Sequence, residues 1–308
     1  MALMFLSADD PAEAWRAALL AEIPELDFQI WPEVGDPAAI DLALVWQPPP
    51  GELARYPNLR AILSLGAGID GLLAQQGLPD VPIARMVDPS FTRTMTEYVV
   101  LATLRHHRQF DHFEREQRAA RWSYAFPPQA ADRRVGVMGL GVLGSAAAAS
   151  LAAHGFPVAG WSREMRQLPG IESFAGRAGL PAFLARTDIL VCLLPLTRDT
   201  AGILNAATFA GLPRGACLIN VARGAHLVEA DLIVALDSGQ LAGATLDVFR
   251  EEPLPAANPL WRHPKVLITP HIASYASPRT AAAGVAANIR RARAGQPLLH
   301  QVDRARGY

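Results

Sequence analysis

The sequence contains few cysteines: only Cys192 and Cys217 occur in 308 residues. Each lies within an apolar run, DILVCLLP and GACLIN, a setting typical of reduced thiols that are buried in strands. The scarcity and placement of these cysteines argue against a disulfide framework or a metal framework. Because such thiols persist in a reducing compartment, we expect the protein in the cytoplasm.

The chain also has no excess of charge of either sign. Lysine and arginine number 28 against 29 aspartates and glutamates, which gives a net charge of −1. Nucleic-acid binding requires a basic surface, which this balance does not provide. One apolar stretch, residues 135–153, approaches the length of a membrane span, but its four glycines favour a strand, a turn and a buried helix. We therefore expect small molecules and copies of the chain itself as partners, with no nucleic acid and no membrane.

Short apolar runs alternate with amphipathic runs along most of the chain. In the first part, strands are expected at residues 3–7, 27–31, 42–46, 59–65 and 81–84, with helices at 11–23 and 68–76. A second series begins at residue 134, with strands in RVGVM, FPVAGWS, DILVCLLP, GACLINVA, GATLDVF and KVLITP, and helices at 142–154, 180–186, 205–211 and 227–238. Strands that alternate with helices predict an α/β fold with parallel sheets covered on both faces.

Two further helices lie outside this alternation. Residues 91–121 contain neither glycine nor proline and predict one long helix that connects two domains. Its charged far end, RQFDHFEREQRAAR, is typical of a solvated face or a subunit contact. The final helix is expected to have Ser277 as its N-cap and Pro278 in its first position, and to end at Gly295.

A glycine-rich turn follows the first strand of the second series. Residues 139–144 read GLGVLG, a G-x-G-x-x-G between an expected strand and an alanine-rich helix. In a dinucleotide site the first glycine makes the tight turn, the second admits the pyrophosphate, and the third lets the helix pack on the strand. A plain strand-to-helix turn is the alternative. The predicted cofactor contacts are Gly139, Leu140, Gly141, Val142, Leu143 and Gly144.

The residues after the next strand indicate which nicotinamide cofactor binds. An acidic residue there would bind the ribose 2′-hydroxyl of NAD. This chain instead has Trp161, Ser162 and Arg163. A hydroxyl and a guanidinium suit a 2′-phosphate, because arginine can pair with it through two hydrogen bonds. We therefore predict NADPH, with NADH possible; an arginine on a solvent-facing loop without any role is the alternative for Arg163.

Three later strands each end near one polar group. Arg223 follows a buried strand, Glu252 precedes a proline, and His271 follows the last strand. The carboxyl ends of parallel strands form the ligand crevice of an open sheet, so these groups could converge. A histidine can protonate a carbonyl near neutral pH, a carboxylate beside it favours the imidazolium, and an arginine can hold a substrate carboxylate.

Each of these residues also has a structural interpretation. Arg223 could pair with a structural acid, Glu252 adjoins Glu251 on what could be a plain exposed loop, and a histidine after proline is often a turn residue. The dinucleotide turn upstream favours the joint interpretation, reduction of a 2-keto acid. The other seven histidines are interpreted as structural or surface residues.

The chain resembles the D-isomer-specific 2-hydroxyacid dehydrogenases over nearly its whole length. The matching segments keep the family's order and spacing; they are SLGAGID (64–70), MTEYVV (95–100), GLGVLG (139–144), CLLPLTRDTAGILN (192–205), INVARGAHLVE (219–229), TLDVFREEPLP (245–255) and TPHIAS (269–274). Within the family, VWQPP (45–49), the WSR segment and the short chain are most similar to the glyoxylate/hydroxypyruvate reductase A branch.

The resemblance implies a set of site residues. It implies Arg223, Glu252 and His271 as the catalytic set, and it selects Glu252 over Glu251. It also implies backbone N–H groups of Ala67 and Gly68 at the substrate carboxylate, and Trp46 in the substrate pocket. The remaining implied cofactor contacts are Leu194, Pro195, Val221, Ala222, Asp247, His271 and Ala273.

The resemblance further implies two doubly wound parallel-sheet domains with a cleft between them. A flavodoxin-like substrate domain would comprise residues 1–98 and 275–308, and a Rossmann nucleotide domain would comprise residues 99–274. The implied substrates are small 2-keto acids such as glyoxylate and hydroxypyruvate, and the implied assembly is a homodimer. Arg93 is unusual at its position and could touch substrate or cofactor. The alternatives are a dehydrogenase for another 2-hydroxy acid that uses NADH, and a nucleotide-sensing corepressor without catalysis.

Overall fold

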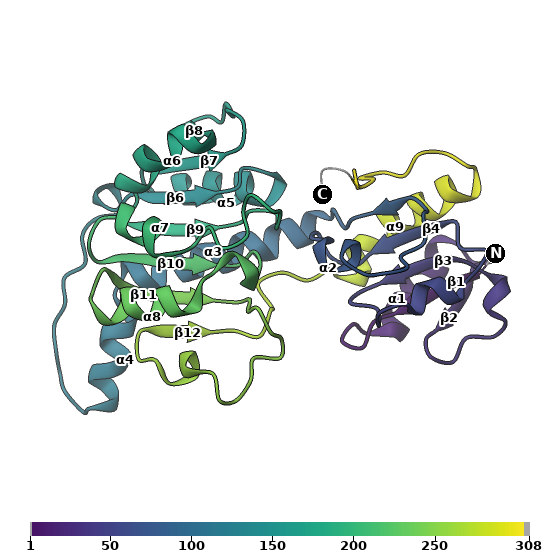
Figure 1. Cartoon of the computed structure of the whole chain (residues 1–308), viewed down its shortest axis with the longest axis horizontal. Coiled ribbons are helices and arrows are strands. Elements are labelled where there is room, and N and C mark those ends of the chain that lie inside the picture. The colour runs from purple at the N-terminus through teal and green to yellow at the C-terminus, as the bar shows by residue number, and fades with distance from the viewer. Residues whose placement is uncertain (1, 305–308) are drawn as a thin grey trace. The chain divides into compact units, whose positions relative to one another are not determined.

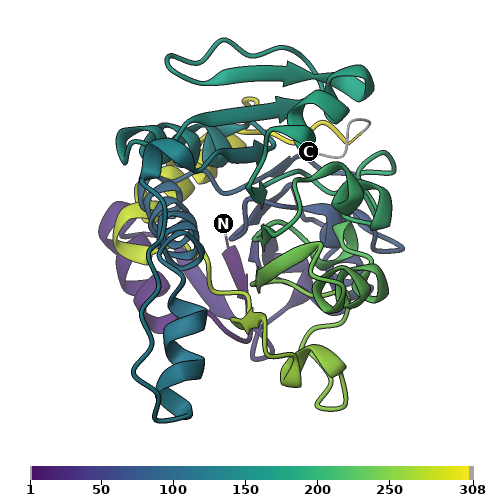
Figure 2. The same cartoon turned by 90° about the vertical axis from the view of Figure 1, so that its left-hand side faces the viewer.

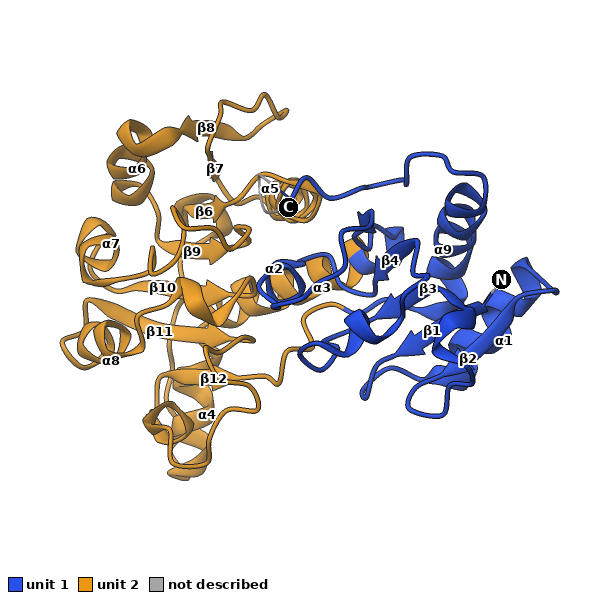
Figure 3. Cartoon of the chain, turned by 45° about the vertical axis from the view of Figure 1, so that its right-hand side comes forward, with its two compact units in different colours: residues 1–91, 275–308 blue, residues 92–274 orange. Residues whose placement is uncertain are grey.

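The computed structural model describes residues 2–304, which divide into two compact units (Figure 3). Unit 1 comprises residues 1–91 and 275–308, and unit 2 comprises residues 92–274. The first break thus falls at 91/92, earlier than the predicted 98/99. The reason is that the helix crossing this point places Met95, Val99 and Ala102 in the core of unit 2.

Unit 1 contains a five-stranded sheet in the order β2-β1-β3-β4-β5, in which all pairs are parallel (Figure 1). Its burial pattern is that of a sheet covered on both faces, since every residue of β1 and β4 is buried. Its elements are β1 (Ala2–Leu6), α1 (Ala12–Glu22), β2 (Asp27–Ile30), η1 (Pro37–Ala39), β3 (Ile40–Val45), η2 (Glu52–Arg55), β4 (Ala61–Ser64), α2 (Asp70–Leu73), β5 (Ile83–Ala84) and α9 (Pro278–Arg293). Helix α9 packs against α1, with Arg293 paired to Glu25 at 3.0 Å.

Unit 2 contains a seven-stranded parallel sheet in the order β12-β11-β10-β9-β6-β7-β8. This order reverses at β6, as in a doubly wound dinucleotide-binding fold, so the predicted fold class is confirmed for both units. The strands are β6 (Val135–Met138), β7 (Val158–Ser162), β8 (Glu172–Ala175), β9 (Ile189–Cys192), β10 (Ala216–Asn220), β11 (Leu241–Leu246) and β12 (Val266–Ile268). The helices are α3 (Pro89–His107), α4 (Phe110–Arg118), η3 (Ala130–Asp132), α5 (Val142–Ala153), α6 (Gly176–Ala185), α7 (Ala206–Gly211), η4 (Gly224–His226), α8 (Glu229–Asp237) and η5 (Pro259–Arg262).

The two faces of this sheet have separate apolar cores. Successive side chains of a strand point to opposite faces, so Ile189 and Val191 join the core under α3 and α5, while Leu190 and Cys192 join the core under α6, α7 and α8. The strands are therefore apolar on both faces, which explains the unbroken runs in the sequence. Their carboxyl ends all lie at one edge, where the chain enters the loops that carry the predicted site residues.

The prediction of one long helix over residues 91–121 is wrong. Helix α3 ends at His107 and α4 begins at Phe110, because Gln109 between them has φ +58° and this left-handed conformation cannot continue the helix. Helix α4 and the extended segment after it project together from the sheet of unit 2 (Figure 2). No glycine or proline marks this break in the sequence.

Two smaller expectations also differ from the structure. Strand β8 was not predicted, because its residues Glu172–Ala175 are only partly buried at the sheet edge and form no apolar run. Ser277 precedes α9 as its N-cap, but its side chain makes no capping hydrogen bond. Among residues 2–304, no helix has the length and apolar character that a membrane span requires.

Candidate active site

The glycine-rich turn joins β6 to α5, and two of its glycines are required by the backbone. Gly139 has φ +98°, and a Cβ there would come within 2.6 Å of the Leu193 carbonyl oxygen. A Cβ on Gly144 would overlap the Gly139 carbonyl, so this glycine lets the helix pack on the turn. Nothing lies within 4 Å of a Cβ position on Gly141, the N-cap of α5. The turn thus combines open space with a helix N-terminus, which fits the pyrophosphate of a dinucleotide.

The segment after β7 lies beside this turn, since the Gly139 N–H donates to the Trp161 carbonyl at 2.8 Å. Trp161 is buried, and its indole N–H donates to the Gly176 carbonyl at 2.8 Å, which fixes the start of α6. The Arg163 side chain is 64% exposed and lies 3.8 Å from the Glu164 carboxylate. The Arg163 guanidinium is thus at the surface, and the predicted contact of Arg163 with a 2′-phosphate stays a prediction, while Trp161 has a structural contact.

Two more predicted cofactor segments follow the neighbouring strands. Leu194 and Pro195 come after β9, and Val221 and Ala222 come after β10; all except Pro195 are buried. Fully buried His226 connects the two loops, because its Nε2 lies 3.3 Å from the Pro195 carbonyl and its Nδ1 lies 3.1 Å from the Arg223 carbonyl. The sequence predicted His226 only as a structural or surface residue, and the structure shows it buried between these two loops.

His271 and Glu252 form a close pair. The His271 Nδ1 lies 2.7 Å from Glu252 Oε2, and the Phe249 N–H donates to Glu252 Oε1 at 2.8 Å. A carboxylate only accepts, so the His271 Nδ1 carries the proton in this hydrogen bond. Burial raises the pKa of Glu252, but the hydrogen bonds from His271 and Phe249 and the charge of Arg223 outweigh it, so this pKa lies below its usual value.

Arg223 follows β10 in extended conformation, and its Nη1 donates to the Ala222 carbonyl at 2.8 Å. The next residue, Gly224, lets this loop touch the one that carries Glu252. A Cβ on Gly224 would overlap the backbone of Phe249 and Arg250. Sequence reasoning missed Gly224, although the glycine directly after the predicted catalytic arginine was a signal for such a close approach.

The turn at residues 269–273 positions His271, which has φ +55°. Asp247 is 1% exposed, and its carboxylate accepts hydrogen bonds from Thr269 Oγ1, the Ile272 N–H and the Ala273 N–H. The Asp247 carbonyl also accepts from the His271 N–H at 2.8 Å. Asp247 thus holds this turn, and its predicted contact with the cofactor stays a prediction.

The predicted substrate residues of unit 1 come together at the carboxyl edge of its own sheet. Trp46 follows β3, while Gly66, Ala67 and Gly68 follow the neighbouring β4. A Cβ on Gly66 would overlap the Trp46 ring, so the indole lies directly on this loop. Trp46, Ala67 and Gly68 are partly exposed, as a binding role requires. Arg93 is exposed on α3 in unit 2.

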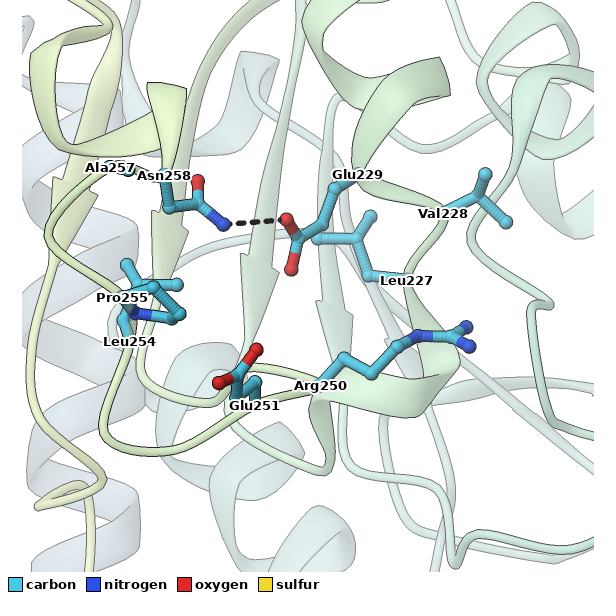
Figure 4. A pocket seen from close by; sticks show the side chains of 9 residues that line it. All are labelled: Leu227, Val228, Glu229, Arg250, Glu251, Leu254, Pro255, Ala257 and Asn258. Carbon is cyan, nitrogen blue, oxygen red and sulfur yellow. Dashed lines mark hydrogen bonds between the residues drawn. The ribbon is translucent and has the colours of Figure 1, made fainter.

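A pocket of about 550 Å³ lies next to the loop that carries Glu252 (Figure 4). Inside it the Asn258 side-chain amide donates to Glu229 at 3.0 Å. Its lining comprises Leu227, Val228, Glu229, Arg250, Glu251, Leu254, Pro255, Ala257 and Asn258. Because Arg223, Glu252 and His271 are absent from this lining, the predicted catalytic set lies outside the pocket.

Comparisons with known proteins show the family of the chain. Residues 100–273 match the model of the D-isomer specific 2-hydroxyacid dehydrogenase NAD binding domain. The chain is 43% identical to glyoxylate/hydroxypyruvate reductase A of Yersinia enterocolitica over 100% of both chains, and 46% identical to that of Serratia proteamaculans over 96% of both.

Solved structures give the same result. A D-isomer specific 2-hydroxyacid dehydrogenase from Xanthobacter autotrophicus Py2, in complex with NADPH and MES, superimposes with a TM-score of 0.95 at 52% identity, covering 100% of this chain and 99% of that one. An NADPH-dependent glyoxylate/hydroxypyruvate reductase from Sinorhizobium meliloti, in complex with NADP and sulfate, gives 0.93 at 43% identity and covers both chains completely. With the family model and these full-length relatives in agreement, the chain belongs to the D-isomer-specific 2-hydroxyacid dehydrogenase family.

Proposed function

We propose that the protein reduces small 2-keto acids, glyoxylate and hydroxypyruvate, to 2-hydroxy acids with NADPH. The observation that carries this proposal is the His271–Glu252 pair, 2.7 Å apart, with Arg223 on the adjoining loop. Relatives named glyoxylate/hydroxypyruvate reductase A support the substrate class. Structural neighbours crystallised with NADPH or NADP support the cofactor.

The three residues have complementary parts in this reaction. NADPH, when bound, supplies the hydride. His271 donates its Nε2 proton to the carbonyl oxygen, while Glu252 stabilises the imidazolium through Nδ1 and fixes the plane of the ring. The Arg223 guanidinium pairs with the substrate carboxylate and polarises the carbonyl.

We also assign a substrate-binding part to residues of unit 1, as the family resemblance implies. The backbone N–H groups of Ala67 and Gly68 bind the substrate carboxylate, and the Trp46 indole limits the size of the group on the keto carbon. This assignment is supported by the family resemblance and by the contact of Trp46 with Gly66. A large 2-keto acid is therefore a poor substrate.

The cofactor is held by three segments in our proposal. Residues 139–144 bind the pyrophosphate, Ser162 and Arg163 bind the 2′-phosphate, and the loops after β9 and β10 contact the nicotinamide half together with Asp247 and Ala273. The exposed Arg163 supports NADPH over NADH, because a 2′-phosphate adds the negative charge that a guanidinium pairs with.

The test is a spectrophotometric assay of purified protein with glyoxylate or hydroxypyruvate, first with NADPH and then with NADH. We expect turnover with both acids and a higher kcat/KM with NADPH. Arg163→Ala should raise the KM for NADPH roughly 10-fold and leave that for NADH nearly unchanged, since one charge-assisted contact is removed. Absence of turnover with any small 2-keto acid would refute the enzyme assignment.

We further propose that the protein is a homodimer that uses the segment after α4. Trp122, Tyr124 and Phe126 are 90%, 73% and 89% exposed, and the last two rings stack 6.4 Å apart. Aromatic side chains gathered on an exposed surface are typical of protein interfaces. A second copy of the chain would cover them.

A reducing compartment, the cytoplasm, is our proposal for location. Cys192 and Cys217 are free and buried. Burial raises the pKa of each thiol to about 12, so both stay protonated and unreactive.

A further inference from the structure

Tyr98 on α3 reaches the turn that carries His271. Its hydroxyl oxygen lies 2.5 Å from Thr269 Oγ1, and Thr269 Oγ1 donates to Asp247 Oδ1 at 2.6 Å. Because the single hydroxyl proton of Thr269 is directed at the carboxylate, Thr269 can only accept from Tyr98. The hydrogen bonds therefore run in one direction, from the tyrosine through the threonine to the aspartate.

The tyrosine is a permanent donor in this chain of bonds. Burial raises the pKa of Tyr98 to about 12; the hydrogen bond with Thr269 acts against this shift, and the charge of Asp247 adds to it. The phenol thus keeps its proton over the whole working pH range. Thr94 Oγ1 also contacts Ser274 Oγ at 3.0 Å, so α3 meets both ends of the turn.

The hydrogen bonds to Asp247 determine the geometry of the turn that carries His271. His271 has φ +55°, a conformation that a residue with a side chain keeps only when its surroundings enforce it. Asp247 enforces it through the N–H groups of His271, Ile272 and Ala273. A shift of Asp247 would therefore turn the His271 ring relative to Glu252.

We propose that Tyr98 is a positioning residue for His271, and that it acts through the Thr269 hydroxyl and Asp247. This inference rests on the proposed function, in which His271 is the proton donor. The charged and titratable groups around the ring are Glu252 at Nδ1, Arg223 beside Glu252, and Asp247 and Tyr98 at the turn. Loss of the phenol hydroxyl weakens the bond between Nδ1 and Glu252, and the imidazolium loses part of its stabilisation.

The first experiment compares Tyr98→Phe with Tyr56→Phe. Tyr56 is a matched control, because its buried hydroxyl donates to Glu52 at 2.9 Å within unit 1. We expect Tyr98→Phe to lower kcat roughly 10-fold, with KM for the keto acid within about 2-fold, since a displaced catalytic group slows chemistry more than binding. The alkaline limb of the kcat/KM profile should move down by about 0.5 pH unit. Tyr56→Phe should leave both the rate and the profile unchanged.

The second experiment needs neither cofactor nor turnover. The imidazole of His271 is followed by NMR in the cofactor-free protein, and its resonance is assigned by its loss in His271→Gln. We expect it to titrate at lower pH in Tyr98→Phe than in the unchanged protein. If the resonance shifts while the unchanged protein reduces no keto acid, the proposed function fails and the positioning role stands. An active enzyme whose titration and pH profile are unaltered by Tyr98→Phe would overturn the positioning role.

The relay itself is tested at Thr269. Thr269→Val should reproduce the loss seen with Tyr98→Phe, and Thr269→Ser, which keeps the hydroxyl, should restore activity. The double variant Tyr98→Phe with Thr269→Val should be no slower than Thr269→Val alone, because both changes interrupt one path. If the fold-losses in rate of the two single variants multiply in the double variant, Tyr98 does not act through Thr269.

Discussion

Both carboxylate oxygens of Glu252 are engaged, one by His271 and one by the Phe249 N–H. The carboxylate therefore cannot rotate away from the imidazole without losing a second bond. These two hydrogen bonds also help to hold the pKa of Glu252 below its ordinary value, so the carboxylate stays ionised at lower pH. In the proposed reaction, His271 would thus be oriented for proton donation before a substrate binds.

Removal of the His271 imidazole should lower the rate of the chemical step and leave cofactor binding nearly unchanged. In His271→Ala we expect kcat to fall by about 10²- to 10⁴-fold, the usual contribution of a general acid, while the Kd for NADPH stays within about 2-fold. Stopped-flow assays and fluorescence titration measure the two quantities. Arg223→Ala should differ, with a raised KM as well as a lower kcat, because it also loses the substrate carboxylate. Unchanged rates in both variants would show that the site has been assigned wrongly.

A second histidine, His106, should make stability depend on pH. It is buried, with Nε2 3.0 Å from Thr245 Oγ1, and burial, aided by Arg105 and Arg133 and opposed by Asp111, lowers its pKa from 6.5 to about 4. Between these values the unfolded chain binds a proton that the folded chain does not. Stability from this group is therefore present above pH 6.5 and is lost as the pH falls towards 4, by up to about 1.4 kcal/mol per pH unit.

Urea unfolding between pH 4.5 and pH 7.5 checks this slope. In His106→Gln the decrease in the free energy of unfolding from pH 7.5 to pH 4.5 should be smaller by the amount that His106 contributes. His154→Gln is the control, because His154 is exposed and should leave the slope as it is. An equal slope in His106→Gln would mean that the buried imidazole takes up its proton without cost.

At the scale of elements, the loops after β10 and β11 can meet only because residue 224 is glycine. In Gly224→Ala the new methyl group would overlap the backbone of Phe249 and Arg250, which cannot move as a side chain can. We expect kcat/KM to fall at least 100-fold and stability to fall by about 1–3 kcal/mol. NADPH binding at the separate glycine turn should persist, as fluorescence titration would show.

Gly284→Ala is the matched control for this change. A Cβ there meets no atom within 4 Å, and the residue is exposed within helix α9. We expect normal activity and a gain of about 0.5–1 kcal/mol in stability, since alanine favours the helix. If Gly224→Ala behaved in the same way, the close approach of the two loops would not be needed for activity.

The sequence could predict those parts of the fold that a short run of neighbouring residues determines. Strands such as β9 and β10 are buried apolar runs, and Arg223 could be predicted at the site because it directly follows such a run. The break at Gln109 and the edge strand β8 have no such signal, since each depends on what packs around it. The bond between Tyr98 and Thr269 joins residues 171 positions apart, so no spacing rule could reveal it.

At the scale of the whole molecule, the exposed side chains of Trp122, Tyr124 and Phe126 predict that the protein forms a dimer. Trp122→Ser together with Phe126→Ser should convert a dimer to a monomer in light scattering, because the contact loses its largest apolar side chains. Met165→Ser is the control, since this side chain is 63% exposed but belongs to a different loop. A protein that is monomeric before any change, or dimeric after the double change, would contradict the proposed interface.

The division of unit 1 into two chain segments has a consequence for biosynthesis. Helix α1 packs against α9, yet α9 leaves the ribosome only after all of unit 2 has been made. Residues 92–274 form one continuous stretch and can fold as soon as they emerge. The first strands must wait without the cover of α9, so unit 1 can complete its fold only after Pro278–Arg293 has been synthesised.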